Sequence, residues 1–207
     1  MDAVVWIDLW AAIPFGLAWL GVVAVLRFRK RRTPLYLILF SLFYVYVYKV
    51  LDYTLLQFQS LILAKYFMPN LILRGTETGK SLNLIPLVTL STQDVQTSLL
   101  NVLLFVPLGF GLPFITELRM KSIVVIGLLF SAAIELLQLA TGLIASVAFR
   151  IADVNDVIFN TMGAAIGYIL FLGFVRGYRR LTRDWKISRG SISRYIAERP
   201  QASEPHG

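Results

Sequence analysis

Five residues in the last third of the chain combine polar chemistry with helical spacing. Asp153, Asp156, Asn160, Gly163 and Gly167 are separated by steps of three, four, three and four residues, which predicts one stripe along one helix. The stripe begins with two carboxylates, continues with an amide and ends in a Gly-x-x-x-Gly pair. Because hydrocarbon side chains occupy the other faces, we expect a membrane helix whose polar and small side is turned toward other protein.

The composition supports a membrane environment. The 207 residues are 57% hydrophobic and only 15% charged, with a mean hydropathy of +0.70. These values lie outside the usual range of soluble proteins. A spanning helix needs about 20 mostly apolar residues. We therefore predict an all-α fold, a polytopic transmembrane helical bundle with about five spans, at residues 6–26, 34–58, 98–115, 123–140 and 154–174.

The basic residues predict how the bundle is oriented. With five spans, the clusters at 27–32 and 119–121 and the tail after residue 175 all fall on one side. The positive-inside rule then places the N-terminus outside and the C-terminus in the cytoplasm. These flanks also explain the net charge of +8, so nucleic-acid binding is not expected. The expected regions are two transmembrane helices with a short interfacial segment at 1–79, a three-helix core at 80–175 and a short polar, basic cytoplasmic tail at 176–207.

The inventory of reactive side chains narrows the possible chemistry. The chain has no cysteine, which excludes disulfides, thiolate metal sites and cysteine nucleophiles. The single histidine, His206, lies in the polar C-terminal end, so catalysis by an imidazole is not expected. Carboxylates, lysines, hydroxyls or a metal ion would have to supply any chemistry.

A second stripe of the same kind lies in the fourth predicted span. Gly127, Ser131, Glu135, Gln138 and Gly142 follow steps of four, four, three and four residues. Small residues occupy one end and polar residues the other, as in the last span. We expect the small residues of the two stripes, including Ser131, Gly127, Gly163 and Gly167, to let the fourth and fifth spans approach closely.

At about 1.5 Å of rise per residue, the polar residues of several spans reach the same depth in the outer half of the bilayer. The candidates for a binding pocket are Asn83, Pro86, Asn101, Glu135, Gln138, Arg150, Asp153, Asp156 and Asn160. In a structural interpretation, the acids pair with Lys49 and Arg150 and lock the bundle, or Lys49 pairs with Asp52, its neighbour on the helix. In a functional interpretation, the group forms a polar pocket open to the outer leaflet, where Arg150 holds a phosphate or carboxylate.

At these residues the sequence resembles the VanZ-like family of bacterial membrane proteins. The resemblance covers roughly residues 80–170 and leaves the first two spans outside. It rests on Asn-Leu-Ile-Pro at 83–86, the segment from Asn101 to Gly109, Glu-Leu-Leu-Gln at 135–138 and the segment from Arg150 to Gly163. The family is named for a protein that confers low-level resistance to teicoplanin, a lipidated glycopeptide antibiotic. The resemblance implies a role at the cell envelope, in the bacterial plasma membrane.

Two functional hypotheses of different classes follow. The first is a non-enzymatic protein that binds a lipid-linked cell-wall intermediate or protects against lipidated glycopeptides, with the lipid bilayer as its environment and no cofactor or metal. The alternative is an intramembrane, metal-dependent enzyme acting on a polyprenyl or phospholipid head group. Asp153 and Asp156 would then hold Mg²⁺, and Glu135 would complete the shell or act as a base. A transporter and a structural scaffold are further possibilities.

Overall fold

The computed structural model describes residues 2–56, 82–83, 92–145, 152–184 and 195. Its long helices are α1 (Asp2–Ala24), α2 (Pro34–Leu51), α5 (Thr92–Ile115), α6 (Met120–Ala145) and α7 (Val154–Asp184). Short π-helical turns, η1 (Val25–Arg29) and η2 (Asp52–Leu56), continue the first two helices. Five helices are long and apolar enough to cross a membrane, which confirms the predicted all-α bundle of about five spans. The chain is therefore a multi-pass membrane protein.

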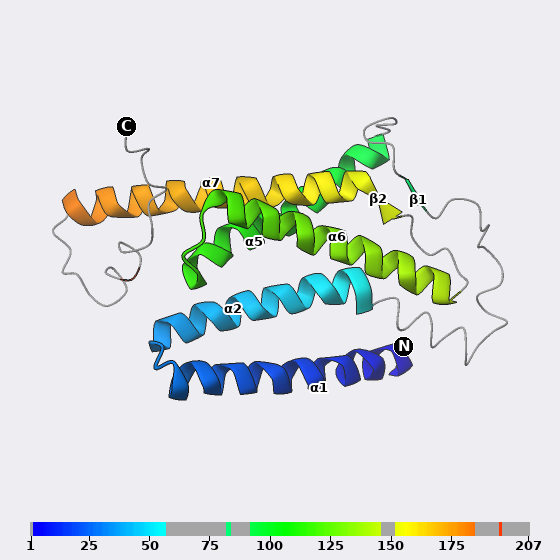
Figure 1. The fold of residues 1–207 in the computed structure, drawn as a ribbon, viewed down its shortest axis with the longest axis horizontal. Helices are drawn as coiled ribbons and strands as arrows, with labels where there is room; N and C mark the ends of the chain where they lie inside the picture. The colour runs from blue at the N-terminus through cyan, green and yellow to red at the C-terminus, as the bar shows by residue number, and fades with distance from the viewer. Residues whose placement is uncertain (1, 57–81, 84–91, 146–151, 185–194, 196–207) are drawn as a thin grey trace.

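Helices α5 and α7 run parallel and pack closely against each other, on the side of the bundle away from α1 (Figure 1). Gly163 of α7 faces the backbone of Val102, and Gly167 faces the backbone of Val106, one turn further along α5. In return, Gly109 of α5 faces the carbonyl of Ala164. A methyl group on any of these glycines would collide with the backbone of the opposite helix, so the glycines permit this close approach.

This arrangement differs in part from the expected packing of the small residues. A Cβ on Gly127 of α6 would lie 2.7 Å from Cβ of Ala164, so α6 and α7 do approach through a small pair. Gly163 and Gly167, however, face α5 rather than α6. Gly109 lies on the α5 side of this contact, so glycines of both helices let the two backbones meet without intervening side chains.

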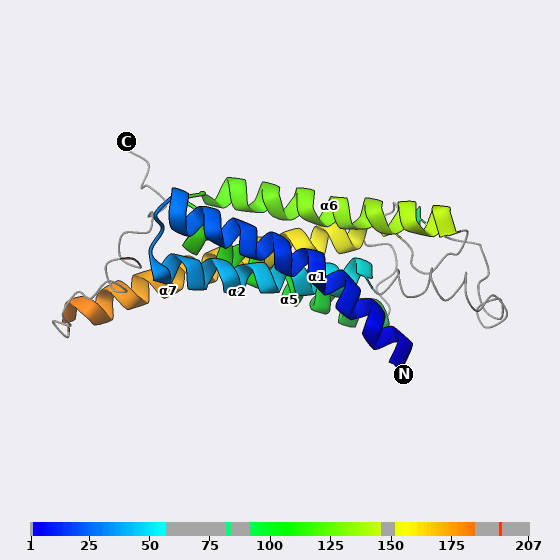
Figure 2. The same ribbon diagram turned by 90° about the horizontal axis from the view of Figure 1, so that it is seen from below.

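The N-terminal helices pack on one side of the α5–α7 pair. The Tyr46 hydroxyl of α2 donates a hydrogen bond of 2.7 Å to the Leu104 carbonyl of α5. Helix α1 lies at the outer edge against α2 (Figures 1 and 2), joined by a hydrogen bond of 3.0 Å from the Trp19 indole to the Ser41 hydroxyl. The described side chains of α1 contribute no buried residue, so α1 is held mainly by α2 and by the surrounding membrane.

The described basic residues gather at one end of the bundle. Apart from Lys49, every described lysine and arginine lies at the end formed by η1, the start of α2, the α5–α6 connection and the end of α7. The opposite end carries the acidic residues Asp52, Glu135, Asp153 and Asp156. This separation agrees with the positive-inside pattern, while the orientation itself stays a prediction.

Helix α7 is longer than the predicted span, and two predicted segments lie wholly or partly outside the described residues. Helix α7 continues to Asp184, beyond the predicted end at residue 174, because the arginine-rich segment after it favours the helix as well. The predicted interfacial segment and residues 185–194 and 196–207 of the tail lie outside the described residues.

The close contact of α5 with α7 gives a prediction with a matched control. In Gly167→Ala, the new methyl group collides with the α5 backbone, and overpacking of this kind costs about 1–3 kcal/mol. Gly173→Ala, on the same helix, meets no atom within 4 Å, so it is neutral or slightly stabilising through the better helix propensity of alanine. Thermal unfolding of the detergent-solubilised protein measures both. Equal effects of the two substitutions would contradict the parallel packing.

Candidate functional site

The acidic end of the bundle is organised by the start of α7. Asp153 lies in the strand β2 (Ala152–Asp153) and not on the helical stripe, which corrects the sequence prediction for this residue. Its carboxylate accepts a hydrogen bond of 2.8 Å from the backbone N–H of Asn155. Asp153 thus caps α7, because a carboxylate satisfies an N–H group that the first turn of a helix leaves without an intrahelical partner.

A short parallel pairing brings a distant segment to this cap (Figure 1). Strand β1 (Leu82–Asn83) pairs with β2, with Leu82 opposite Ala152 and Asn83 opposite Asp153. The first residue of the Asn-Leu-Ile-Pro motif therefore lies beside the acidic start of α7. The backbone groups of this non-helical segment are partly satisfied by the pairing, which a polypeptide at membrane depth requires.

Glu135 of α6 reaches the same point from the other side. Its Oε2 accepts a hydrogen bond of 3.1 Å from the backbone N–H of Asp153, and its side chain is only 8% exposed. A buried carboxylate is costly unless hydrogen bonds compensate it. The bond from Asp153 supplies part of this compensation and fixes the end of α6 to the start of α7.

Asn101 connects a third helix, α5, to the start of α7. Its amide nitrogen donates a hydrogen bond of 2.5 Å to Oδ1 of Asp156, in the first turn of α7. Asn101 is buried, whereas Asp156 is half-buried. A hydrogen bond to a charged acceptor contributes more than one between neutral groups. This contact therefore fixes the polar ends of α5 and α7, one turn before their glycines meet.

Asn160 lies one turn deeper in the bundle. Its amide nitrogen donates to the hydroxyl of Ser131 on α6 over 2.9 Å, and the two side chains are 4% and 0% exposed. The Oδ1 atom of Asn160 is buried and has no hydrogen-bond partner among the described residues. Ser131, predicted only as a packing residue, is thus also a polar partner.

Gln138 connects α6 with the end of α2. Its amide donates a hydrogen bond of 2.9 Å to the backbone carbonyl of Thr54 in η2, and both residues are buried. Thr54 was not predicted from the sequence. Its side chain gave no signal for this contact, because Gln138 bonds the backbone carbonyl of Thr54 in the π-helical turn, whereas the Thr54 hydroxyl bonds the Val50 carbonyl.

The predicted partners of the acids lie elsewhere or outside the described residues. Lys49 forms an ion pair of 2.8 Å with Asp52, as its spacing indicates, and its side chain is 67% exposed. Pro86 and Arg150 lie outside the described residues, and of Asn83 only the backbone is described. The acidic network, defined here as Asn101, Glu135, Asp153 and Asp156, is the part of the predicted site that the structure brings together.

The network is distinct from two cavities of the bundle. One, of about 260 Å³, lies between α1 and α2, and the other, of about 520 Å³, lies between α2, α5 and α7. Both are lined by apolar and aromatic side chains, and no network residue lines either. Among the described residues, no group of three acidic or histidine side chains is placed to hold a metal ion. Within the described part of the chain, the magnesium alternative therefore has Asp153 and Asp156 as its candidate ligands.

The contact between Asn101 and Asp156 can be tested by a double-mutant cycle. We expect Asn101→Ala and Asp156→Ala each to lower the free energy of unfolding by about 1–3 kcal/mol, because each leaves a polar group without its partner. Their combined effect should be less than the sum, with a coupling of about 0.5–3 kcal/mol. Thr161→Val is the control, because this hydroxyl bonds only within its own helix, to the Val157 carbonyl. Additive effects would show that the two side chains do not interact.

A comparison with protein families identifies the family of the chain. The VanZ/LLP1 family model matches residues 35–176. No curated protein and no solved structure matches the chain. The match is wider than the resemblance described from the sequence, because it also includes α2, and it contains every residue of the acidic network. The chain therefore belongs to the VanZ/LLP1 family.

Proposed function

We propose that the protein binds the head group of a lipid-anchored cell-envelope molecule at the acidic network. The ligand is a lipid-linked cell-wall intermediate or a lipidated glycopeptide antibiotic, and the protein acts by binding rather than by catalysis. Both ligands join a hydrocarbon tail to a head group rich in hydroxyl, amide and amine donors. The proposal includes a location in the bacterial plasma membrane with the acidic end outside.

The observation that carries this proposal is the convergence of three helices and a strand pair on one acidic point. Glu135 from α6 accepts a hydrogen bond from the backbone of Asp153, beside the strand that contains Asn83. Three residues further along, Asp156 in the first turn of α7 accepts a hydrogen bond from Asn101 of α5. Maintaining several carboxylates at the edge of an apolar bundle is costly. The arrangement is useful for a ligand that presents donors and positive charge, because the fixed acceptors do not have to reorganise when it binds.

The competing explanation is that the acidic network only stabilises the fold. The two explanations differ in whether they need the negative charge of Asp156. A scaffold needs the hydrogen bond between Asn101 and Asp156 but not the negative charge of Asp156. Asp156→Asn separates the two roles, since an amide oxygen can still accept the hydrogen bond from Asn101. Ligand binding, by contrast, loses a charged acceptor.

Binding of teicoplanin and of a polyprenyl-linked sugar–peptide precursor to the purified full chain tests the proposal. We expect Asp156→Asn to weaken the true ligand by about tenfold or more, because a hydrogen bond to a charged group contributes about 1.5–3 kcal/mol. Its melting temperature should stay above that of Asp156→Ala, because the amide oxygen still accepts the hydrogen bond that alanine loses. Thr161→Val, on the same helix, should change neither binding nor stability.

The pattern of outcomes also identifies the ligand. Weakened binding of only one of the two compounds assigns the site to that compound, and a matching loss of teicoplanin resistance in cells would connect binding with protection. If both compounds bind the Asp156→Asn variant as they bind the wild type, or if neither binds the wild type, the network is not a head-group site.

The metal-dependent alternative has its own test. The two aspartates at the start of α7 favour it, since carboxylate oxygens are the ligands that Mg²⁺ prefers in proteins. The full chain would be incubated with a polyprenyl-diphosphate or phospholipid substrate, with magnesium and with a chelator. Turnover that needs magnesium and is lost in Asp153→Asn would support an enzyme. Turnover that is insensitive to the chelator would rule out the metal-dependent form.

A further inference from the structure

The larger cavity lies away from the acidic network, between α2, α5 and α7. Its volume is about 520 Å³, and apolar or aromatic side chains line it, including Leu35, Leu39, Phe43, Phe110 and Phe114. The one hydroxyl in the lining, that of Tyr46, is directed to the Leu104 carbonyl over 2.7 Å. The cleft therefore offers its occupant hydrocarbon contacts.

The cleft opens on the surface of the bundle. Three of its lining residues are exposed, namely Leu42 at 64%, Phe174 at 42% and Pro107. This part of α2 and α5 belongs to the spanning segments, so the opening faces lipid. An empty cleft of this size would leave its walls without the dispersion contacts that a well-packed occupant provides. A lipid chain is the occupant that the surroundings supply.

The length and the position of the cleft match one leaflet. Its α2 wall runs from Leu35 to Tyr46, which is about 17 Å of helix at about 1.5 Å per residue. The hydrocarbon core of a bilayer is about 30 Å thick, so the cleft covers about half of it. That half adjoins the basic end, because Leu35 lies in the first turn of α2.

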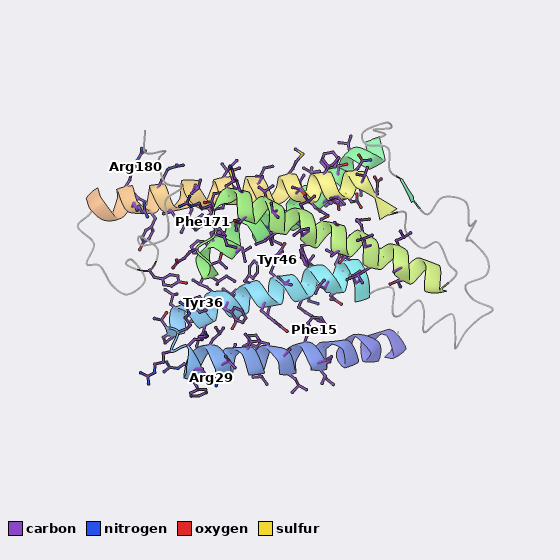
Figure 3. All side chains as sticks on the ribbon, viewed as in Figure 1. Phe15, Arg29, Tyr36, Tyr46, Phe171 and Arg180 are labelled. Carbon is purple, nitrogen blue, oxygen red and sulfur yellow. The ribbon has the colours of Figure 1, made fainter. Side chains whose placement is uncertain are left out.

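Cationic side chains lie at the basic end of the bundle, near Leu35, where the α2 wall of the cleft begins. The Arg32 guanidinium lies 4.8 Å from the ring centroid of Tyr36, which fixes it beside the first turn of α2. The Tyr36 hydroxyl in turn donates to the Ile115 carbonyl over 3.2 Å and joins α2 to the end of α5. Arg29 and Arg180 lie at the same end of the bundle (Figure 3). A planar guanidinium is well suited to a phosphate.

From this combination we propose that the cleft between α2, α5 and α7 binds an anionic phospholipid. One acyl chain lies along the aromatic walls, and the phosphate lies at the basic end beside Arg32. This site is independent of the head-group site proposed above, since it lies in the opposite half of the bundle and shares none of its residues. The charge of the lipid provides the selectivity, because basic residues near the membrane surface attract anionic lipids.

Native mass spectrometry of the full chain in detergent, supplemented with phosphatidylglycerol or with phosphatidylcholine of the same chains, tests the proposal. We expect the wild type to retain one phosphatidylglycerol in preference to phosphatidylcholine. Leu42→Trp fills the mouth of the cleft and should abolish the retention of both lipids. Ile38→Trp is the matched control, because Ile38 lies one turn earlier on α2, is 58% exposed and does not line the cleft.

A second variant tests the charge of Arg32 separately from the shape of the cleft. Arg32→Gln leaves the cleft open, so it should lower phosphatidylglycerol retention by roughly fivefold, the ratio that about 1 kcal/mol produces, and leave phosphatidylcholine unchanged. Retention of phosphatidylglycerol by Leu42→Trp at the wild-type level would overturn the proposal. An equal loss in Ile38→Trp, or equal retention of the two lipids by the wild type, would also overturn it.

Discussion

The structure depends on one constraint, which is that polar groups inside a membrane bundle must find their partners within the protein. Two successive parts of α7 together satisfy this constraint. Its first turns place Asp156 and Asn160 against Asn101 and Ser131 of the neighbouring helices. Its next turns carry Gly163 and Gly167, which bring the α5 backbone close enough for the polar contacts to form. The glycines and the polar residues of α7 therefore act together, since the hydrogen bonds between the helices require the close approach that the glycines allow.

Much of this arrangement was predictable from periodicity. Helical spacing identified the polar stripes of α6 and α7, and the apolar runs located the spans, because both signals are local. The partners of the stripes were not predictable in the same way. Both α5 and α6 carry a glycine that faces α7, namely Gly109 and Gly127, so the glycine pattern alone does not decide which helix Gly163 faces. The capping role of Asp153 was missed because helical spacing continues smoothly across the actual start of α7.

Two chemically different ends follow from the same topology. The basic end gathers nearly all described lysines and arginines, and the acidic end gathers the hydrogen-bonded network beside the β1–β2 pair. A membrane protein with such a separation interacts differently with the two leaflets. Under our proposals, the acidic end recognises donor-rich head groups, and the basic end retains an anionic phospholipid along the cleft. Family membership agrees with the location in the membrane, and the two binding sites are inferred from the chemistry of the residues.

The most direct measurement concerns which end faces outside, because the head-group proposal requires the acidic end to be there. The chain has no native cysteine, so single cysteines report without background. Ser81→Cys, immediately before β1, and Lys30→Cys, at the basic end, would each be exposed to a membrane-impermeant thiol reagent on intact cells. The account predicts labelling at position 81 and none at position 30 until the membrane is permeabilised. Labelling at position 30 alone would place the acidic network in the cytoplasm and contradict the proposed binding of outer-leaflet ligands.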